Sequence, residues 1–67
     1  MIKKAYIVEF EKNGVKYGRA FTDLDQMRVH LIHGWDLPYD ESRLIQSEQC
    51  GVIYDHEGIK ITQVGLV

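Results

Sequence analysis

Cysteine and proline are almost absent from this 67-residue chain, which has one of each, Cys50 and Pro38. A single cysteine excludes an internal disulfide and is typical of a reducing compartment, so we expect a cytoplasmic protein. A chain of this length forms one domain, residues 1–67, and buries only about 60% of the surface that its unfolded state exposes. Without a disulfide to add stability, we expect a homo-oligomer, dimeric or larger, or a complex with a partner protein.

Long apolar runs and an excess of one charge are also missing. No run approaches the roughly 20 apolar residues that span a bilayer, so we expect no membrane association. Lysine and arginine total 8 against 10 aspartates and glutamates, a formal net charge of −2. This balance argues against extensive contact with nucleic acid. The chain also lacks a glycine-rich phosphate loop and a convergent acid–base pair, so we expect no enzyme and no cofactor.

The strongest local signal is the Asn13-Gly14 step between two alternating runs, 5–10 and 15–21. Both residues tolerate positive φ, so the step predicts a two-residue type I′ turn in a β-hairpin. The turn sets a register whose facing pairs are Lys12–Val15, Glu11–Lys16, Phe10–Tyr17, Val8–Arg19 and Tyr6–Phe21. One face of this ribbon is therefore large and apolar, with Arg19 at its rim, and the other carries small residues.

A helix is predicted from Asp23 to His33. Thr22 suits the N-cap, and the aspartates that follow suit the positive end of the helix dipole. Apolar residues recur at helical spacing and form one stripe, which consists of Leu24, Met27, Leu31 and Trp35. Gly34 suits the C′ position that ends a helix. We expect this helix to lie across one face of the sheet.

The second half of the chain predicts a loop over residues 35–42 and then more strands. The segment Arg43–Cys50 fits a strand, which we favour because helical spacing stops after Ile45, or a short helix. Strands over 52–54 and 59–62 flank a three-residue turn at 56–58 that pairs Asp55 with Ile59. The alternation changes phase near Gln63, which indicates a bulge or a tail that leaves the sheet.

These elements predict an α+β fold. It is a small single domain with a mostly antiparallel β-sheet and one helix packed on one face, in the order ββαβββ. The expected core consists of Tyr6, Val8, Phe10, Phe21, Leu24, Met27, Leu31, Trp35, Leu44, Ile53 and Ile61.

The histidines and the cysteine are the best candidates for chemistry. His30 and His33 are spaced to share one helical face, and Cys50 and His56 could complete a tetrahedral metal site if the second hairpin approached. The spacing matches no standard zinc pattern, and the helical histidines lie off the apolar stripe. Cys50 precedes a glycine in an apolar neighbourhood that does not suit a reactive thiol. We therefore predict no metal site and no catalytic residue.

Acidic and aromatic residues alternate in the central loop, where Trp35, Asp36, Tyr39, Asp40 and Glu41 are the predicted partner-binding residues. Aromatic side chains dominate interface hot spots, and carboxylates suit a basic partner surface. The alternative is a solvated loop whose Trp35 fills the core and whose acids only keep it soluble.

The small-residue face of the first hairpin and the apolar end of the chain predict a surface for self-association. Ile7 and Ala20 lie on that face, where a second sheet could pack, and Leu66 and Val67 end the chain. The other interpretation is that these are scattered apolar residues with no role.

The function favoured by this reading is a small non-catalytic protein–protein interaction module. In its small size, balanced charge and lack of catalytic residues, the chain looks like phage or mobile-element accessory proteins, which inhibit a host factor by occupying its surface. The alternative is a dimeric nucleic-acid-binding accessory protein or transcription regulator. Its basic stripe would be assembled from Lys3, Lys4, Lys12, Lys16 and Arg19.

Overall fold

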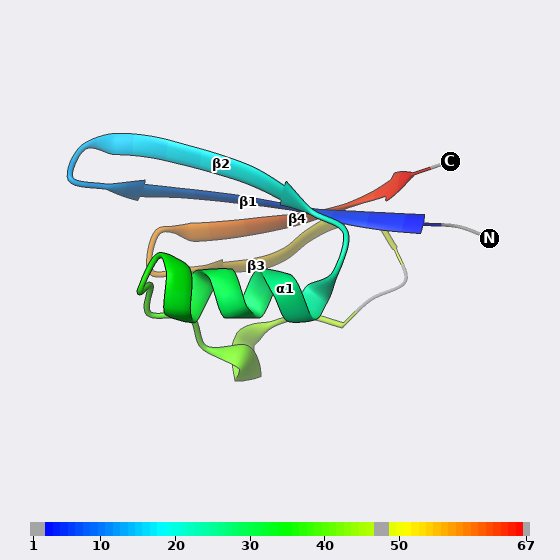
Figure 1. Ribbon diagram of the computed structural model, residues 1–67. Coiled ribbons are helices and arrows are strands. Elements are labelled where there is room, and N and C mark those ends of the chain that lie inside the picture. Colours follow the sequence, from blue (N-terminus) through cyan, green and yellow to red (C-terminus); the bar gives the residue numbers. More distant parts are fainter. Residues whose placement is uncertain (1–2, 47–48, 67) are drawn as a thin grey trace.

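Four antiparallel strands and one helix form the fold in the computed structural model, which describes residues 3–46 and 49–66 (Figure 1). The strands are β1 (Lys3–Lys12), β2 (Val15–Phe21), β3 (Gly51–His56) and β4 (Ile59–Leu66). Their order in the sheet is β2-β1-β4-β3, so β2 and β3 are the edges. The predicted α+β fold class is confirmed.

The first hairpin has the predicted register. Asn13 and Gly14 form the turn with φ of 55° and 78°, the left-handed values that a type I′ turn requires. The facing pairs run from Lys12–Val15 to Tyr6–Phe21, as expected. The turn sequence therefore determines which side chains of β1 and β2 share a face.

The second hairpin differs from the prediction by one residue. Its turn consists of Glu57 and Gly58, with φ of 54° and 78°, and His56 faces Ile59. The predicted three-residue loop was wrong because Glu57 adopts the left-handed conformation that few non-glycine residues adopt. The shorter turn shifts the register, so that Tyr54 faces Ile61 and is buried in the core, of which it was not an expected member.

The bulge of this sheet lies in β3 and not, as predicted, near Gln63. Pairing shifts between Val52 and Tyr54, so Ile53 is the extra residue, and both Ile53 and Tyr54 are buried. Strand β4 continues past Gln63 without a break, so the tail that would leave the sheet was also wrong. The apolar alternation changes phase at Gln63 because this polar residue takes the inward position after Ile59 and Ile61. Its side-chain amide is buried and donates to the Gln49 carbonyl at 2.9 Å.

The predicted helix is α1 (Leu24–Val29), and the chain continues as a π-helical turn, η1 (His30–Gly34). Asp23 is the N-cap and accepts a hydrogen bond from the Asp25 N–H at 2.8 Å, so the assignment of Thr22 to this position was wrong. The aspartate carboxylate satisfies a free N–H at the positive end of the helix.

The end of the helix also differs from the prediction. The Trp35 N–H donates to the His30 carbonyl at 2.8 Å, which closes the wide π turn around Gly34. Gly34 therefore lies inside the turn instead of at C′, and the residue with positive φ is Asp36, at 52°. This reversal directs the chain back across the sheet.

The strand predicted over Arg43–Cys50 does not form in the described part of that segment. The chain instead makes a 3-10 turn, η2 (Glu41–Arg43), because Asp40 caps it through the Ser42 N–H. Beyond the turn, the Ile45 N–H donates to the Ile53 carbonyl at 2.8 Å without continuing as a strand. Residues 47–48 lie outside the described residues.

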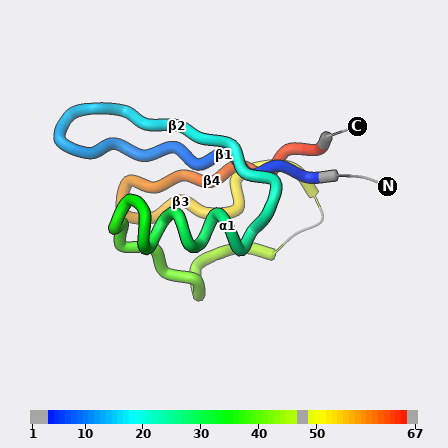
Figure 2. The backbone as a smooth tube through the Cα atoms, in the orientation of Figure 1, coloured from blue at the N-terminus to red at the C-terminus, as the bar shows by residue number. Residues whose placement is uncertain are grey.

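The core lies between the sheet and two covering segments (Figure 2). Helix α1 and η1 cover the β2 side, where His30 contacts Phe21, and the central loop covers the β3 side, where Tyr39 contacts Tyr54. Every residue expected in the core is buried there or packs against it, and Tyr54 and Ile59 are further members. Among the described residues, no helix or loop covers the opposite, outer face of the sheet (Figure 1).

Candidate functional site

Strand β2 forms an open edge of the sheet. Of the described strands, only β1 pairs with β2, and every β2 residue except Phe21 is exposed. The hydrogen bonds of the turn join Val15 to Lys12. From Val15 onward, residues whose backbone N–H and C=O groups bond to β1 alternate with residues whose groups point away from β1. The register therefore directs the N–H and C=O groups of three residues away from β1, toward solvent. These residues are Lys16, Gly18 and Ala20.

A groove runs along this edge, between β2 and the helix. It has a volume of about 390 Å³. The groove is lined by Arg19, Phe21, Asp25, Gln26, Val29 and His30. Phe21 is buried at its base, whereas Val29 exposes 57% of its surface on the helical wall. Helix α1 follows β2 after only a short connection, and this connection places a helical wall beside the strand.

Arg19 holds its guanidinium over the groove without an acidic partner. Its Nη1 donates to the Nε2 of His30 at 3.0 Å, and its guanidinium carbon lies 5.3 Å from the centre of the Phe21 ring. Because arginine can only donate, this bond requires a His30 whose Nε2 carries no proton. No carboxylate of the described residues forms an ion pair with Arg19. The guanidinium is therefore positioned and available for an external acid.

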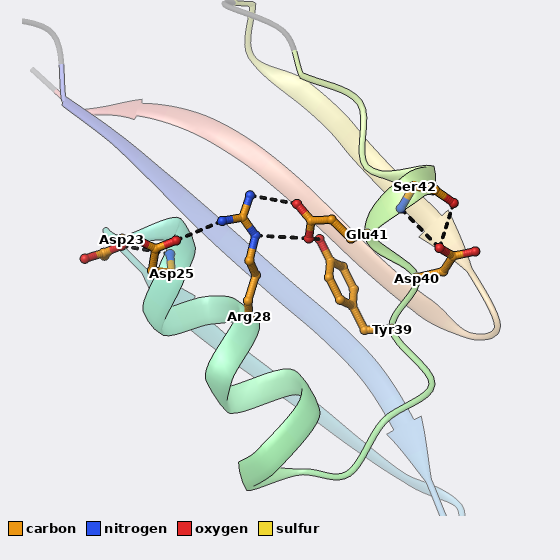
Figure 3. Close-up of polar contacts among 7 residues, drawn as sticks. All are labelled: Asp23, Asp25, Arg28, Tyr39, Asp40, Glu41 and Ser42. Atoms are coloured by element: carbon orange, nitrogen blue, oxygen red, sulfur yellow. Dashed lines mark hydrogen bonds and ion pairs between the residues drawn. The ribbon is translucent and has the colours of Figure 1, made fainter.

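The central loop is attached to the helix by a cluster around Arg28 (Figure 3). Two guanidinium nitrogens of Arg28 contact the two carboxylate oxygens of Glu41, at 3.0 and 2.7 Å. Tyr39 donates its hydroxyl to the same carboxylate at 2.6 Å, and Asp25 accepts from Arg28 at 2.8 Å. A bidentate arginine–carboxylate pair has one preferred geometry, so it fixes the loop against α1.

These contacts shift several pKa values. Burial, with the hydrogen bond to Glu41, raises the pKa of the Tyr39 hydroxyl above its usual range. Partial burial alone would raise the pKa of Glu41, but the hydrogen bonds from Tyr39 and Arg28 outweigh it and lower that pKa. Hydrogen bonds from Ser42 lower the pKa of Asp40. Both loop carboxylates are therefore held in their charged forms by contacts within the chain.

The structure brings the predicted partner-binding residues into one loop but gives most of them internal contacts. Trp35 is half-buried, with its ring centre 4.7 Å from that of Phe10, and Tyr39 packs on Tyr54 at 5.1 Å. Glu41 is bound to Arg28, as described above. The other two predicted residues are Asp36 and Asp40.

Asp40 and Asp36 differ in their contacts. Asp40 accepts from the Ser42 N–H at 3.1 Å and from the Ser42 hydroxyl at 2.7 Å, and its other oxygen lies 3.4 Å from Nε of Arg43. Asp36 is exposed. Partner binding by this loop stays a prediction, and its three carboxylates, Asp36, Asp40 and Glu41, are all exposed.

The histidines and the cysteine lie apart. His30 faces β2 and contacts Trp35 at 4.9 Å, whereas His33 is exposed on the π turn. Cys50 is exposed before β3, and His56 lies at the far end of β3. Within the described residues, no three histidine, cysteine, aspartate or glutamate side chains gather as metal ligands would.

The outer face of the sheet carries a row of small and apolar residues. Pairing aligns Ala20 with Ile7, Ile7 with Thr62, and Thr62 with Val52, so the row crosses all four strands. Ile7 is half-buried, Ala20 is exposed, and Val52 exposes 47% of its surface. The predicted contributions of the Leu66 side chain and of Val67 lie outside the described residues.

The candidate basic stripe is split between the two faces. Register places Lys16 on the outer face and Arg19 on the helix face, while Nζ of Lys12 donates to the Trp35 carbonyl at 3.4 Å. Lys4 lies on the helix face at the other end of β1 from Lys12. The side chain of Lys3 lies outside the described residues. These cations do not form one continuous surface.

No helix in the described residues is long and apolar enough to cross a membrane.

The groove was not predicted from the sequence. Its one sequence signal is Val29, an apolar residue that lies off the core-facing stripe of the helix. The pairing of Arg19 with His30 gave no signal, because it joins residues on two elements whose packing distance is set by the core. Comparisons with family models, with curated proteins and with solved structures find no match to this chain. Function is therefore inferred from the geometry of the site.

Proposed function

We propose that this chain is a non-catalytic protein-interaction module that binds a partner by adding a strand of that partner to β2. An extended segment pairs with an unpaired sheet edge through main-chain hydrogen bonds, while its alternate side chains provide specificity. An accessory protein of this kind inhibits a host factor by occupying the segment that it captures.

The open edge of β2 is the observation that carries this proposal. Exposed edge strands invite association, and proteins usually blunt them with charged side chains, proline, bulges or a covering segment. Strand β2 carries two charged side chains, Lys16 and Arg19. The seven residues of β2 contain no proline, and pairing with β1 is regular throughout. The outward backbone groups of Lys16, Gly18 and Ala20 are left for a partner strand.

A proline at Gly18 tests the proposal. Gly18→Pro removes an outward N–H, while the inward bonds of Tyr17 and Arg19 to β1 stay intact. Gly18→Ala is the matched control, because it keeps the N–H and its Cβ would meet only the Val8 carbonyl oxygen, at 3.9 Å. Thermal melts of both variants show whether the fold is kept.

The assay is affinity capture from a lysate of the source cells, with and without nuclease. We expect a stoichiometric protein that survives nuclease, is retained by Gly18→Ala and is lost with Gly18→Pro. Equal capture by both folded variants would contradict strand addition. Capture that collapses on nuclease treatment would favour the alternative, a nucleic-acid-binding accessory protein.

Self-association through the outer face is a second proposal, and it is independent of the first. The row from Ala20 through Ile7 and Thr62 to Val52 supports it, since a second copy could pack its own row against this one as sheets do in a sandwich. This arrangement leaves the edge of β2 free for the partner. A cytoplasmic location fits both proposals.

A further inference from the structure

We infer that the groove beside β2 selects an extended partner segment that carries an apolar residue followed, two positions later, by an acidic residue. This inference rests on the proposed function, and it specifies the chemistry of the strand that β2 accepts.

Strand addition directs alternate side chains of the partner into the groove. The side chains of Arg19 and Phe21 lie on the helix face of the sheet. A strand paired with the outward groups of β2 places every second side chain on that same face, next to these two residues. Helix α1 forms the opposite wall of the groove beside Arg19 and Phe21, so these partner side chains enter the groove. The alternate partner side chains lie on the outer face of the sheet.

The apolar position lies opposite Phe21. The Phe21 ring forms the base of the groove, and Gln26 and Val29 form the wall one helical turn apart. Val29 is 57% exposed in the free protein, and a branched or aromatic partner side chain would cover it. Removal of this apolar surface from water supplies a non-directional contribution to binding.

The acidic position lies opposite Arg19. The guanidinium has no carboxylate partner in the described chain, and its contacts with His30 and Phe21 hold it beside the strand. A partner carboxylate would complete the pair through charge-assisted hydrogen bonds. His30 acts as a positioning residue, because its Nε2 orients the guanidinium.

Asp25 sets the order of the two positions. It lines the groove from the first turn of α1, four residues after Phe21, and is already bound to Arg28 at 2.8 Å. An acidic partner residue beside it would meet a like charge, which disfavours the reverse arrangement. Antiparallel pairing is more stable per residue than parallel pairing, so we take the partner strand as antiparallel to β2. In that direction the partner residue opposite Phe21 precedes the one opposite Arg19, so the apolar residue comes first.

A pair of capped synthetic peptides tests the inference. The first, Thr-Ile-Lys-Leu-Lys-Glu-Thr, presents leucine and glutamate to the groove on alternate positions, and the second has lysine in place of glutamate. Binding to the full chain is followed by amide chemical shifts in NMR titrations up to about 1 mM, a concentration that half-saturates a site with a Kd of that size. We expect the glutamate peptide to shift the β2 and α1 amides and to bind about three- to tenfold more tightly than the lysine peptide.

Two variants identify the residues responsible. Arg19→Glu should reverse the preference, so that the lysine peptide binds more tightly than the glutamate peptide. Val29→Ser should weaken both peptides about threefold, whereas Ile45→Ser, at an apolar residue of matching exposure (58%) beside β3, should weaken neither. Both residues are exposed, so thermal melts of the two variants should match the parent.

The outcomes separate this inference from the proposed function. Equal binding of the two peptides with shifts along β2 would overturn the acidic position and leave strand addition standing. Shifts confined to other surfaces, or no shift with either peptide, would overturn the inference and count against strand addition as well. A glutamate peptide methylated at alternate amide nitrogens, which cannot pair with an edge, should lose binding; unchanged binding would place the contact in the groove without strand addition.

Discussion

The two edge strands of this sheet are treated differently by the rest of the chain. The edge at β3 is interrupted by the bulge at Ile53. The carbonyl of Ile53 accepts a hydrogen bond from the Ile45 N–H at 2.8 Å. The central loop also covers β3, where Asp40 donates its N–H to the Tyr54 hydroxyl at 3.1 Å. The edge at β2 has neither a bulge nor a covering segment among the described residues.

The open edge at β2 is therefore not a general consequence of the small size of the chain. A chain of 67 residues contains enough length to close one edge with its own central loop, and that loop is held in place by the Arg28–Glu41 pair. The other edge stays regular, and it has a groove beside it, where the Arg19 guanidinium contacts His30 but no carboxylate of the described residues. The combination favours a binding role for β2 and a structural role for β3.

The largest effect is expected from a matched pair of tyrosines, one on each edge strand. Tyr54 of β3 is 1% exposed, and Tyr17 of β2 is 45% exposed. Tyr54→Ala should lower the free energy of unfolding by about 3–5 kcal/mol, because it empties a core site. Tyr17→Ala should cost about 1 kcal/mol, mainly through its stacking on Phe10. Urea unfolding measures both, and equal losses would contradict the contrast between the edges.

The closure of β3 can be tested at Ile45. Ile45→Pro removes the N–H that pairs with Ile53, and an unpaired carbonyl should cost about 1–3 kcal/mol. Ile45→Ala keeps the N–H and removes a side chain that is 58% exposed, so it should cost less than about 0.5 kcal/mol. Thermal melts compare the two variants, and similar melting temperatures would mean that this bond does not close the edge.

Ile7→Glu addresses the outer face and leaves both edges unchanged. A charge in the centre of the apolar row should convert an oligomer to a monomer, as read from mass in light scattering at several concentrations. Val29→Glu, at an exposed site on the helix face, is the control and should keep the oligomer. An unchanged mass for Ile7→Glu would exclude this face as the interface.

The smallest effect is a loss of stability in acid, through the contact that holds the loop near β3. The folded-state pKa of Glu41 is lowered, so its contribution is present above the ordinary carboxylate pKa of about 4.3 and is lost as the pH falls through the folded value. Glu41 is half-exposed, so the loss should stay below about 1 kcal/mol. Urea unfolding of the parent and of Glu41→Gln from pH 7 to pH 3 should converge at low pH; a constant difference would contradict this account.

The β2 edge is predicted well from the sequence because a single turn determines its pairing with β1. Asn13 and Gly14 specify a turn, and the turn specifies the register of β1 and β2 without reference to the rest of the fold. The β3 edge depends on events that local patterns do not encode. Glu57 adopts a left-handed conformation, and the segment predicted as a strand over Arg43–Cys50 forms none in its described part.

The candidate site was predicted less well than the fold, for a physical reason. Arg19 was correctly placed at the rim of the apolar face, since hairpin register is enough to place it. The groove beside it depends on how far α1 lies from β2, which is a property of the packed core and of the π turn around His30. A binding surface formed between two elements therefore required the structure.

Amide hydrogen exchange along β2, measured by NMR with and without a bound partner strand, reports whether this edge is the interaction site. In the free monomer, the amides of Lys16, Gly18 and Ala20 should exchange rapidly, while those of Tyr17 and Arg19, which bond to β1, exchange slowly. Binding of the partner should protect the first three and leave the other two unchanged. Protection of Lys16, Gly18 and Ala20 in the free monomer, or no added protection on binding, would contradict the open edge as the interaction site.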